Sequence, residues 1–251
     1  MFENALASLG IGAAKVDTRL EKSTYRQGEQ VLGEVHIQGG NAPQDIDEIY
    51  LFLVMQYHYE GTQAEYVIDE FRLTDRFVID QHETKIIPFH FQLPYDTPVS
   101  TGGSPIYLKT GLDIKRAIDP TDLDGIEVLP HPLIDQILLT IEDIGFRLTQ
   151  VDLDFEQFHS RNPFVQVYRF QPLSSYANYL DLLSLVFQPH GKEVDVIMEI
   201  NRKPVDLKSS MEEALNLDER LVQFVLTVDE IRNIAYLREK LGQYIHSQME
   251  A

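Results

Sequence analysis

The run Ile46-Asp-Glu-Ile-Tyr-Leu-Phe-Leu-Val-Met-Gln-Tyr-His-Tyr59 decides the fold class of this chain. It is rich in aromatic, aliphatic and β-branched residues and contains neither proline nor glycine. Its middle, Leu51-Phe-Leu-Val-Met55, would be apolar on both faces of an extended chain. Such a composition is typical of a long strand inside a sheet.

Shorter segments of the same kind lie on both sides of this run. Glycine pairs, prolines and serines separate them, and hardly any helical periodicity lies between them. This spacing predicts a β-sandwich. Its further strands are expected at residues 15–20, 30–37, 65–79, 84–93 and 106–114.

Residues 115–133 differ from what precedes them. Prolines and charged residues crowd this stretch, and only residues 126–129 have an extended, apolar character. A composition of this kind is typical of a connector between domains. We therefore expect two domains, at residues 1–127 and 128–251.

The second half begins with a short helix, predicted at residues 132–144. Proline lies in its first turn and Gly145 just past its end, as helix termini prefer. Its apolar residues recur at helical spacing: Leu133, Ile137, Leu138, Ile141 and Ile144. Strands are then expected at residues 146–158, 164–170, 178–187, 193–200 and 221–228.

A second, longer helix is predicted from Asp229, a plausible N-cap, to about residue 249. One face of it is apolar and comprises Ile231, Ile234, Leu237, Leu241 and Ile245. This stripe has two interpretations. It packs on the second domain, because a lone helix is marginal in water, or it binds a partner helix or a second copy of the chain as a homodimer.

The charge balance limits the class of partner. The chain has 21 Lys and Arg against 40 Asp and Glu, a net charge of −19, and both halves are acidic. No part offers the basic surface that nucleic acid or anionic lipid would require. The acidic surface either serves solubility or meets a basic partner.

The cellular setting is expected to be the cytoplasm. The chain has no cysteine, which excludes disulfides, thiolate metal sites and a cysteine nucleophile. Residues 1–12 lack the basic region of a signal peptide, and no apolar run is long enough for a transmembrane segment.

No catalytic site, metal site or cofactor site is predicted. Asp119, Asp122 and Asp124 resemble part of a calcium loop, but the twelfth position holds Pro130 instead of the required glutamate. The histidines are scattered without metal-ligand spacing. No nucleophile elbow, phosphate loop or dinucleotide fingerprint is present. The sequence therefore predicts a protein that is not an enzyme.

Several segments resemble a known family, the bacterial sporulation-control proteins of arrestin-like fold. The similarity extends over nearly the whole chain and is specific as a combination of motifs. The segments are Val16-Asp-Thr-Arg-Leu20, Gly28-Glu-Gln-Val-Leu-Gly-Glu-Val-His-Ile-Gln-Gly-Gly40, Ile46-Asp-Glu-Ile-Tyr-Leu51, Phe91-Gln-Leu-Pro94, Tyr107-Leu-Lys-Thr-Gly-Leu-Asp-Ile114, Asp119-Pro-Thr-Asp122, Ile126-Glu-Val128, Pro163-Phe-Val-Gln166 and Val186-Phe-Gln-Pro-His-Gly191.

This resemblance implies a mainly β chain of two arrestin-like, immunoglobulin-type β-sandwich domains in tandem. It implies no catalytic activity and a regulatory role in sporulation, and extends that role to cell division. The partners that it implies are proteins, among them cell-division or cytoskeletal components.

Two sandwiches joined by a charged connector allow a hinge. We expect ion pairs of the connector to hold the domains in one orientation as a latch. Exposed pairs contribute only about 0–1 kcal/mol each, so a partner could release it. The candidates are Asp113, Lys115, Arg116, Asp119, Asp122 and Asp124.

An alternative function is carbohydrate binding, or action on a glycan, by one sheet face. Tyr57, Tyr59 and Tyr66 lie close together in the sequence, and aromatic rings stack on sugars. Tyrosine is also a common strand residue, so ordinary packing explains the same cluster.

Overall fold

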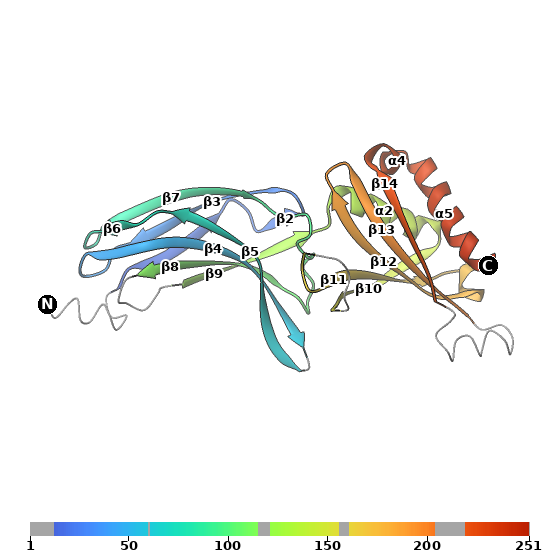
Figure 1. Ribbon diagram of the computed structural model, residues 1–251, viewed down its shortest axis with the longest axis horizontal. Coiled ribbons are helices and arrows are strands. Elements are labelled where there is room, and N and C mark those ends of the chain that lie inside the picture. Colours follow the sequence, from blue (N-terminus) through green and yellow to red (C-terminus); the bar gives the residue numbers. More distant parts are fainter. Residues whose placement is uncertain (1–12, 60, 115–120, 156–160, 204–218, 251) are drawn as a thin grey trace. The chain divides into compact units, whose positions relative to one another are not determined.

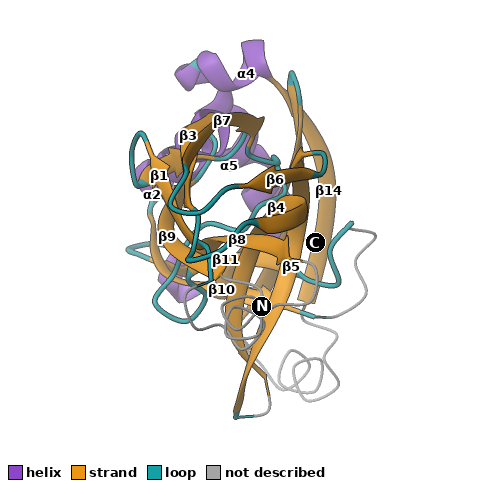
Figure 2. Cartoon of the chain, turned by 90° about the vertical axis from the view of Figure 1, so that its left-hand side faces the viewer, coloured by secondary structure: helices purple, strands orange, loops and turns teal. Residues whose placement is uncertain are grey.

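The computed structural model describes residues 13–59, 61–114, 121–155, 161–203 and 219–250. Strands dominate this part of the chain (Figure 2), which confirms the mainly β prediction. The chain divides into two compact units, Met1–Leu129 and Pro130–Ala251. The boundary expected from the sequence lies two residues before this division.

The first unit is built from two sheets (Figure 1). The smaller has the order β1-β3-β7, and the larger β2-β9-β8-β4-β5, with β6 also paired to β4. All pairs are antiparallel except β2 with β9. The bounds are β1 Lys15–Leu20, β2 Thr24–Arg26, β3 Gln30–Gln38, β4 Gln44–Tyr59, β5 Thr62–Thr74, β6 Phe77–Ile79, β7 Thr84–Gln92, β8 Ile106–Ile114 and β9 Thr121–Leu129.

The strand β4 organises the first unit, as its composition predicts. It pairs with β5, β6 and β8. Its residues Leu51, Leu53 and Met55 are completely buried on the face between the sheets. Opposite them, the rings of Phe71 on β5 and Phe91 on β7 stack at 4.1 Å between centroids, which links the two sheets.

Within the connector expected at residues 115–133, residues 121–129 form the strand β9, which pairs with β8. Residues 115–120 lie outside the described residues. Asp122 and Asp124 continue the inward-facing row of Ile126 and Val128 and are half-buried. Aspartates at inward positions hide the alternation that identifies a strand, which is why the sequence reads as a loop here.

The second unit contains one sheet with the order β10-β11-β12-β13-β14, all antiparallel. Its helices cover one face, so in the described part of this unit helices take the place of a second sheet. The bounds are α2 Pro132–Ile144, β10 Phe146–Asp154, β11 Val165–Pro172, the 3₁₀ turn η1 Tyr176–Asn178, β12 Leu180–His190, β13 Glu193–Arg202, β14 Glu219–Thr227, α4 Val228–Arg232 and α5 Ile234–Glu250.

The sheet face under the helices is the core of the second unit. On β13 every second side chain is completely buried, and these are Val194, Val196, Met198 and Ile200. The helix α5 contacts α2, α4 and β13. The ring of Tyr244 on α5 stacks on Phe224 of β14 at 4.1 Å between centroids.

The helix α2 has the bounds predicted from the sequence. Its buried side chains include Ile134, Ile137, Leu138 and Ile141. Gly145 ends the helix with φ of 130°, in the range that favours glycine. The short helix that opens the second half is therefore confirmed.

The C-terminal helix is present but broken, and its N-cap is Thr227 instead of Asp229. Thr227 and Glu230 form a capping box, in which Thr227 Oγ1 accepts from Glu230 N and Glu230 Oε2 accepts from Thr227 N. Asn233 interrupts the helix because its Oδ1 accepts from Tyr236 N and caps α5 anew.

Lys240 strengthens this cap. Its Nζ donates to Glu230 Oε1 at 2.8 Å. This bond, together with the one from Thr227, lowers the pKa of Glu230 to about 2. The stabilisation from ionised Glu230 is therefore complete above its unfolded pKa of about 4.5 and is lost as the pH falls toward 2.

Removing the cap hydroxyl should weaken the start of α4. We expect Thr227→Ala to lower the free energy of unfolding by about 1 kcal/mol, because Glu230 N loses its acceptor. Thr227→Ser keeps the hydroxyl and should stay close to wild type. Urea denaturation of both variants measures the difference, and equal losses would contradict the capping role.

Candidate functional site

The structure describes only part of the latch expected from the sequence. Asp122 and Asp124 lie on β9 in the first unit, and Asp113 lies on β8, though its side chain is not described. Lys115, Arg116 and Asp119 lie outside the described residues.

Asp122 forms contacts inside the first unit. Its Oδ2 accepts a hydrogen bond from Thr18 N of β1 at 2.6 Å. The hydroxyls of Thr18 and Thr110, both buried, are hydrogen-bonded at 2.5 Å. These polar contacts join β1 of the smaller sheet to β8 and β9 of the larger one. Asp122 therefore helps to hold the two sheets together.

Asp124 lies beside Asp122 in a less favourable environment. Its Oδ2 is buried and, among the described residues, has no hydrogen-bond partner. Burial first, and then the negative charge of Asp122, raise the pKa of Asp124 to about 6. A protonated Asp124 could share its proton with Asp122, so the pair favours one negative charge over two.

The raised pKa makes stability depend on pH. The folded state holds the Asp124 proton more tightly than the unfolded state, whose pKa is near 3.9. This contribution to stability is complete below that value and is lost as the pH rises through about 6.

We expect Asp124→Asn to raise the free energy of unfolding at pH 8 by about 1 kcal/mol, after allowing for screening of a half-buried group. Asp75→Asn, at a side chain 93% exposed, should change it by less than about 0.5 kcal/mol. Denaturation between pH 4 and pH 8 measures both. The prediction fails if the gain is the same at pH 4 as at pH 8.

The apolar stripe of the C-terminal helix is mostly inside the protein. Ile231, Leu237, Leu241 and Ile245 are completely buried, whereas Ile234 is 55% exposed. For these four buried side chains, this conformation agrees with the interpretation that the stripe packs on the second domain. Ile234 alone among the five is open to solvent.

The burial predicts unequal costs of truncation. Leu241→Ala should lower the free energy of unfolding by about 2–5 kcal/mol, because it leaves a cavity between α5 and its neighbours. Ile234→Ala should change it by less than about 0.5 kcal/mol, since its side chain is largely solvated. Calorimetry of both variants makes the comparison, and similar losses would show that the stripe is not core.

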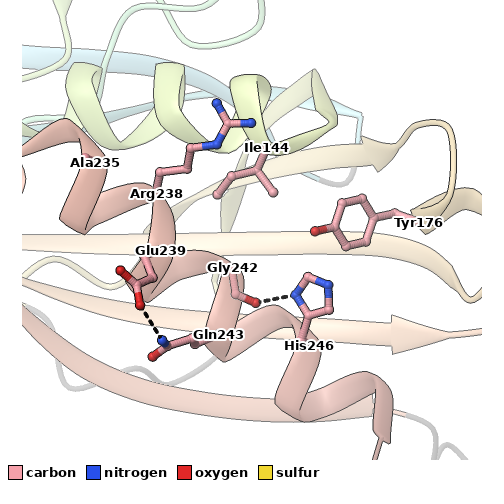
Figure 3. Close-up of a pocket in the computed structure, with 8 residues that line it drawn as sticks. All are labelled: Ile144, Tyr176, Ala235, Arg238, Glu239, Gly242, Gln243 and His246. Carbon is pink, nitrogen blue, oxygen red and sulfur yellow. Dashed lines mark hydrogen bonds between the residues drawn. The ribbon is translucent and has the colours of Figure 1, made fainter.

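A pocket of about 450 Å³ opens on the second unit beside α5 (Figure 3). The end of α2, the turn η1 and one side of α5 form its walls. Its lining residues are Ile144, Tyr176, Ala235, Arg238, Glu239, Gly242, Gln243 and His246. We call this site the α5 pocket.

Polar groups at one wall of the α5 pocket are fixed by neighbours. Arg238 forms an ion pair with Asp143 of α2. Gln243 donates from Nε2 to Glu239 at 3.1 Å. Gly242 has no atom within 4 Å of the position that a Cβ would occupy, so its place on α5 leaves the pocket open.

Aromatic rings form the opposite side. Tyr176 packs on Phe146 at 4.9 Å and meets His246 edge-on at 5.6 Å between centroids. Burial raises the pKa of Tyr176, and the charge of Arg238 opposes that change. His246 Nδ1 lies 2.7 Å from Gly242 O, so Nδ1 carries the proton and donates to this carbonyl.

This arrangement suits binding of a side chain with an apolar body and a polar end. His246 offers Nε2, the ring nitrogen that does not face Gly242 O, and Tyr176 offers a ring and a hydroxyl. The sequence did not indicate these residues as a site. Gly242 within a helical pattern was the one available signal, because glycine weakens a helix unless space is needed there.

The tyrosines considered for glycan stacking lie in the hairpin β4–β5. Tyr57 pairs with Ala64, and Tyr66 with Met55, a completely buried residue. Tyr57 and Tyr66 are half-buried in this inward-facing row. The side chain of Tyr59 lies outside the described residues.

The described residues offer neither a metal-binding cluster nor a membrane-spanning helix. No group of three or more His, Cys, Asp or Glu side chains among them could hold a metal ion. None of the helices described is both long and apolar enough to span a membrane.

Comparisons with known proteins give one consistent result. The family model Spo0M, described as SpoOM protein, matches residues 2–204. The sporulation-control protein spo0M of Bacillus subtilis (strain 168) is 39% identical over 255 residues, which cover 99% of each chain. The crystal structure of Spo0M from the same species matches with a TM-score of 0.83 and 37% identity, covering 95% of this chain and 100% of that one.

Proposed function

This chain belongs to the Spo0M family, and from that premise we propose that it regulates sporulation by binding other proteins, without catalysing a reaction. The observation that supports this most strongly is the 39% identity over 99% of both chains to a protein named for sporulation control. A match of that length includes both units.

Regulation through contacts also agrees with the chemistry of the chain. The net charge of −19 favours basic partner surfaces and disfavours nucleic acid. The α5 pocket offers an amphipathic site of a size that suits one or two side chains of a partner. We assign the α5 pocket as one contact point of this regulator.

The regulatory role in sporulation is tested by replacing the Bacillus subtilis spo0M protein with this chain. We expect this chain, expressed in Bacillus subtilis that lacks its own spo0M, to bring the yield of heat-resistant spores within about threefold of the parent strain. Spores are counted as colonies after heating. If this chain is present at normal levels and the spore yield equals that of the deletion strain, the proposal is wrong.

The same assay tests the α5 pocket. Gly242→Arg fills it without a clash at the Cβ position, so we expect folding to be retained and the spore yield to fall at least tenfold. Ser247→Arg is the matched control, because it adds the same side chain at an exposed position of α5 outside the pocket lining. Equal yields for the two variants would remove the pocket from the mechanism.

A further inference from the structure

The large sheet of the first unit has an unusual outer face. The side chains of Tyr50, Phe52 and Val54 on β4 alternate with the buried row and point away from the core between the sheets. Tyr107 on β8, Val67 on β5 and Leu123 on β9 lie on the same side. We call these six residues the outer apolar face.

The strand register makes these residues neighbours. Val54 pairs with Val67 on one side and with Tyr107 on the other. Phe52 pairs with Lys109, which pairs with Leu123. The rings of Tyr50 and Phe52 stack at 5.8 Å between centroids. Residues directly opposite each other in antiparallel strands lie about 5 Å apart, and diagonal neighbours lie about 7–8 Å apart. Leu123 is diagonal to Tyr107 and is separated from Phe52 by Lys109, so it joins the other five at the edge of the face.

This surface is partly open to solvent. Val54 at its centre is buried at 2% exposure, and Tyr50, Phe52 and Tyr107 around it are half-buried. Leu123 is 49% exposed and Val67 is 48% exposed. All described elements of the first unit are strands, and β1, β3 and β7 pack on the opposite face of the sheet. The solvent side of an antiparallel sheet is normally polar. A contiguous apolar patch at such a place indicates an interaction surface.

Two glycines support this interpretation independently. Gly111 and Gly125 lie in β8 and β9 on the same outward side, and neither has the positive φ that requires glycine. A Cβ would meet Phe52 at 3.7 Å and Tyr107 at 3.8 Å, which are ordinary contacts. Glycine inside a strand weakens it and often marks a place where another chain approaches closely.

The charges around the face indicate the kind of partner. Arg72 is paired with Glu48 at 2.7 Å and with Asp75, and Lys109 lies 4.0 Å from Glu65. Glu70, directly opposite Phe52, is exposed and has no ion pair among the described residues. Arg72 and Lys109 are thus neutralised by neighbouring carboxylates, whereas the charge of Glu70 is not balanced by a described cation. The edge of the outer apolar face at Glu70 therefore attracts positive charge.

We propose that the outer apolar face binds a basic segment of a protein partner. Apolar side chains of that segment lie over Gly111 and Gly125 against the neighbouring rings, and a Lys or Arg meets Glu70. A second copy of this chain fits poorly, because each copy has a net charge of −19. This proposal deepens the proposed function. It rests on that function for one point, namely that the partners of this chain are proteins.

A phage-displayed library of random twelve-residue peptides, selected on the full chain, tests the surface directly. We expect the enriched peptides to be net positive, with apolar residues between Lys or Arg. Their affinities are then measured for the wild type and three variants. Leu123→Lys and Gly125→Val should each weaken binding at least tenfold, through charge repulsion and through the filled space beside Tyr107.

The matched control is Ile86→Lys on β7, where an exposed aliphatic side chain of the other sheet receives the same charge. We expect its affinity to stay within about twofold of wild type. Enriched peptides that are acidic, or that bind Leu123→Lys as well as wild type, would overturn the proposal. So would selective glycan binding on an array that Leu123→Lys abolishes, or a dimer in sedimentation that this variant dissociates.

The spore assay separates this inference from the proposed function. If the wild-type chain restores sporulation and Leu123→Lys restores it equally, the regulatory role stands and the outer apolar face is excluded from it. If the wild-type chain fails to restore sporulation while the peptide data hold, the surface stands and the regulatory role fails.

Discussion

The pairing of β4 with β5, β6 and β8 is the constraint on which the first unit depends. One face of β4 buries Leu51, Leu53 and Met55 completely, and this apolar row fixes the register, because a slip by one residue would expose it. The same register places Tyr50 and Phe52 on the opposite face. The core and the outer apolar face are thus two consequences of one strand alignment.

In the first unit, each sheet buries its apolar face against the other sheet. In the second unit, helices cover the apolar sheet face instead. The sheet face that carries Val194, Val196, Met198 and Ile200 needs a cover, and α2 and α5 supply it. Leu237, Leu241 and Ile245 are completely buried for this purpose, so in this conformation they are not exposed to a partner. What α5 leaves for a partner is its flank, where Gly242 and Tyr176 open the α5 pocket.

The polar groups between the sheets of the first unit have opposite effects on stability. Thr18, Thr110 and Asp122 join the sheets through short hydrogen bonds, but Asp124 stands beside Asp122 with its pKa raised to about 6. At neutral pH this pair costs free energy. Asp122 and Asp124, two of the residues that suggested a connector latch, thus face inward from β9 within one unit.

The sequence by itself determined the mainly β class, the helix at Pro132–Ile144 and the apolar stripe of the last helix, because periodicity and capping are local properties. The tertiary structure decided the rest. The strand β9 was hidden by inward aspartates, and the helix break at Asn233 depended on its contact with Tyr236 N. The α5 pocket and the outer apolar face join residues far apart in the chain, and only strand register and helix packing bring those residues together.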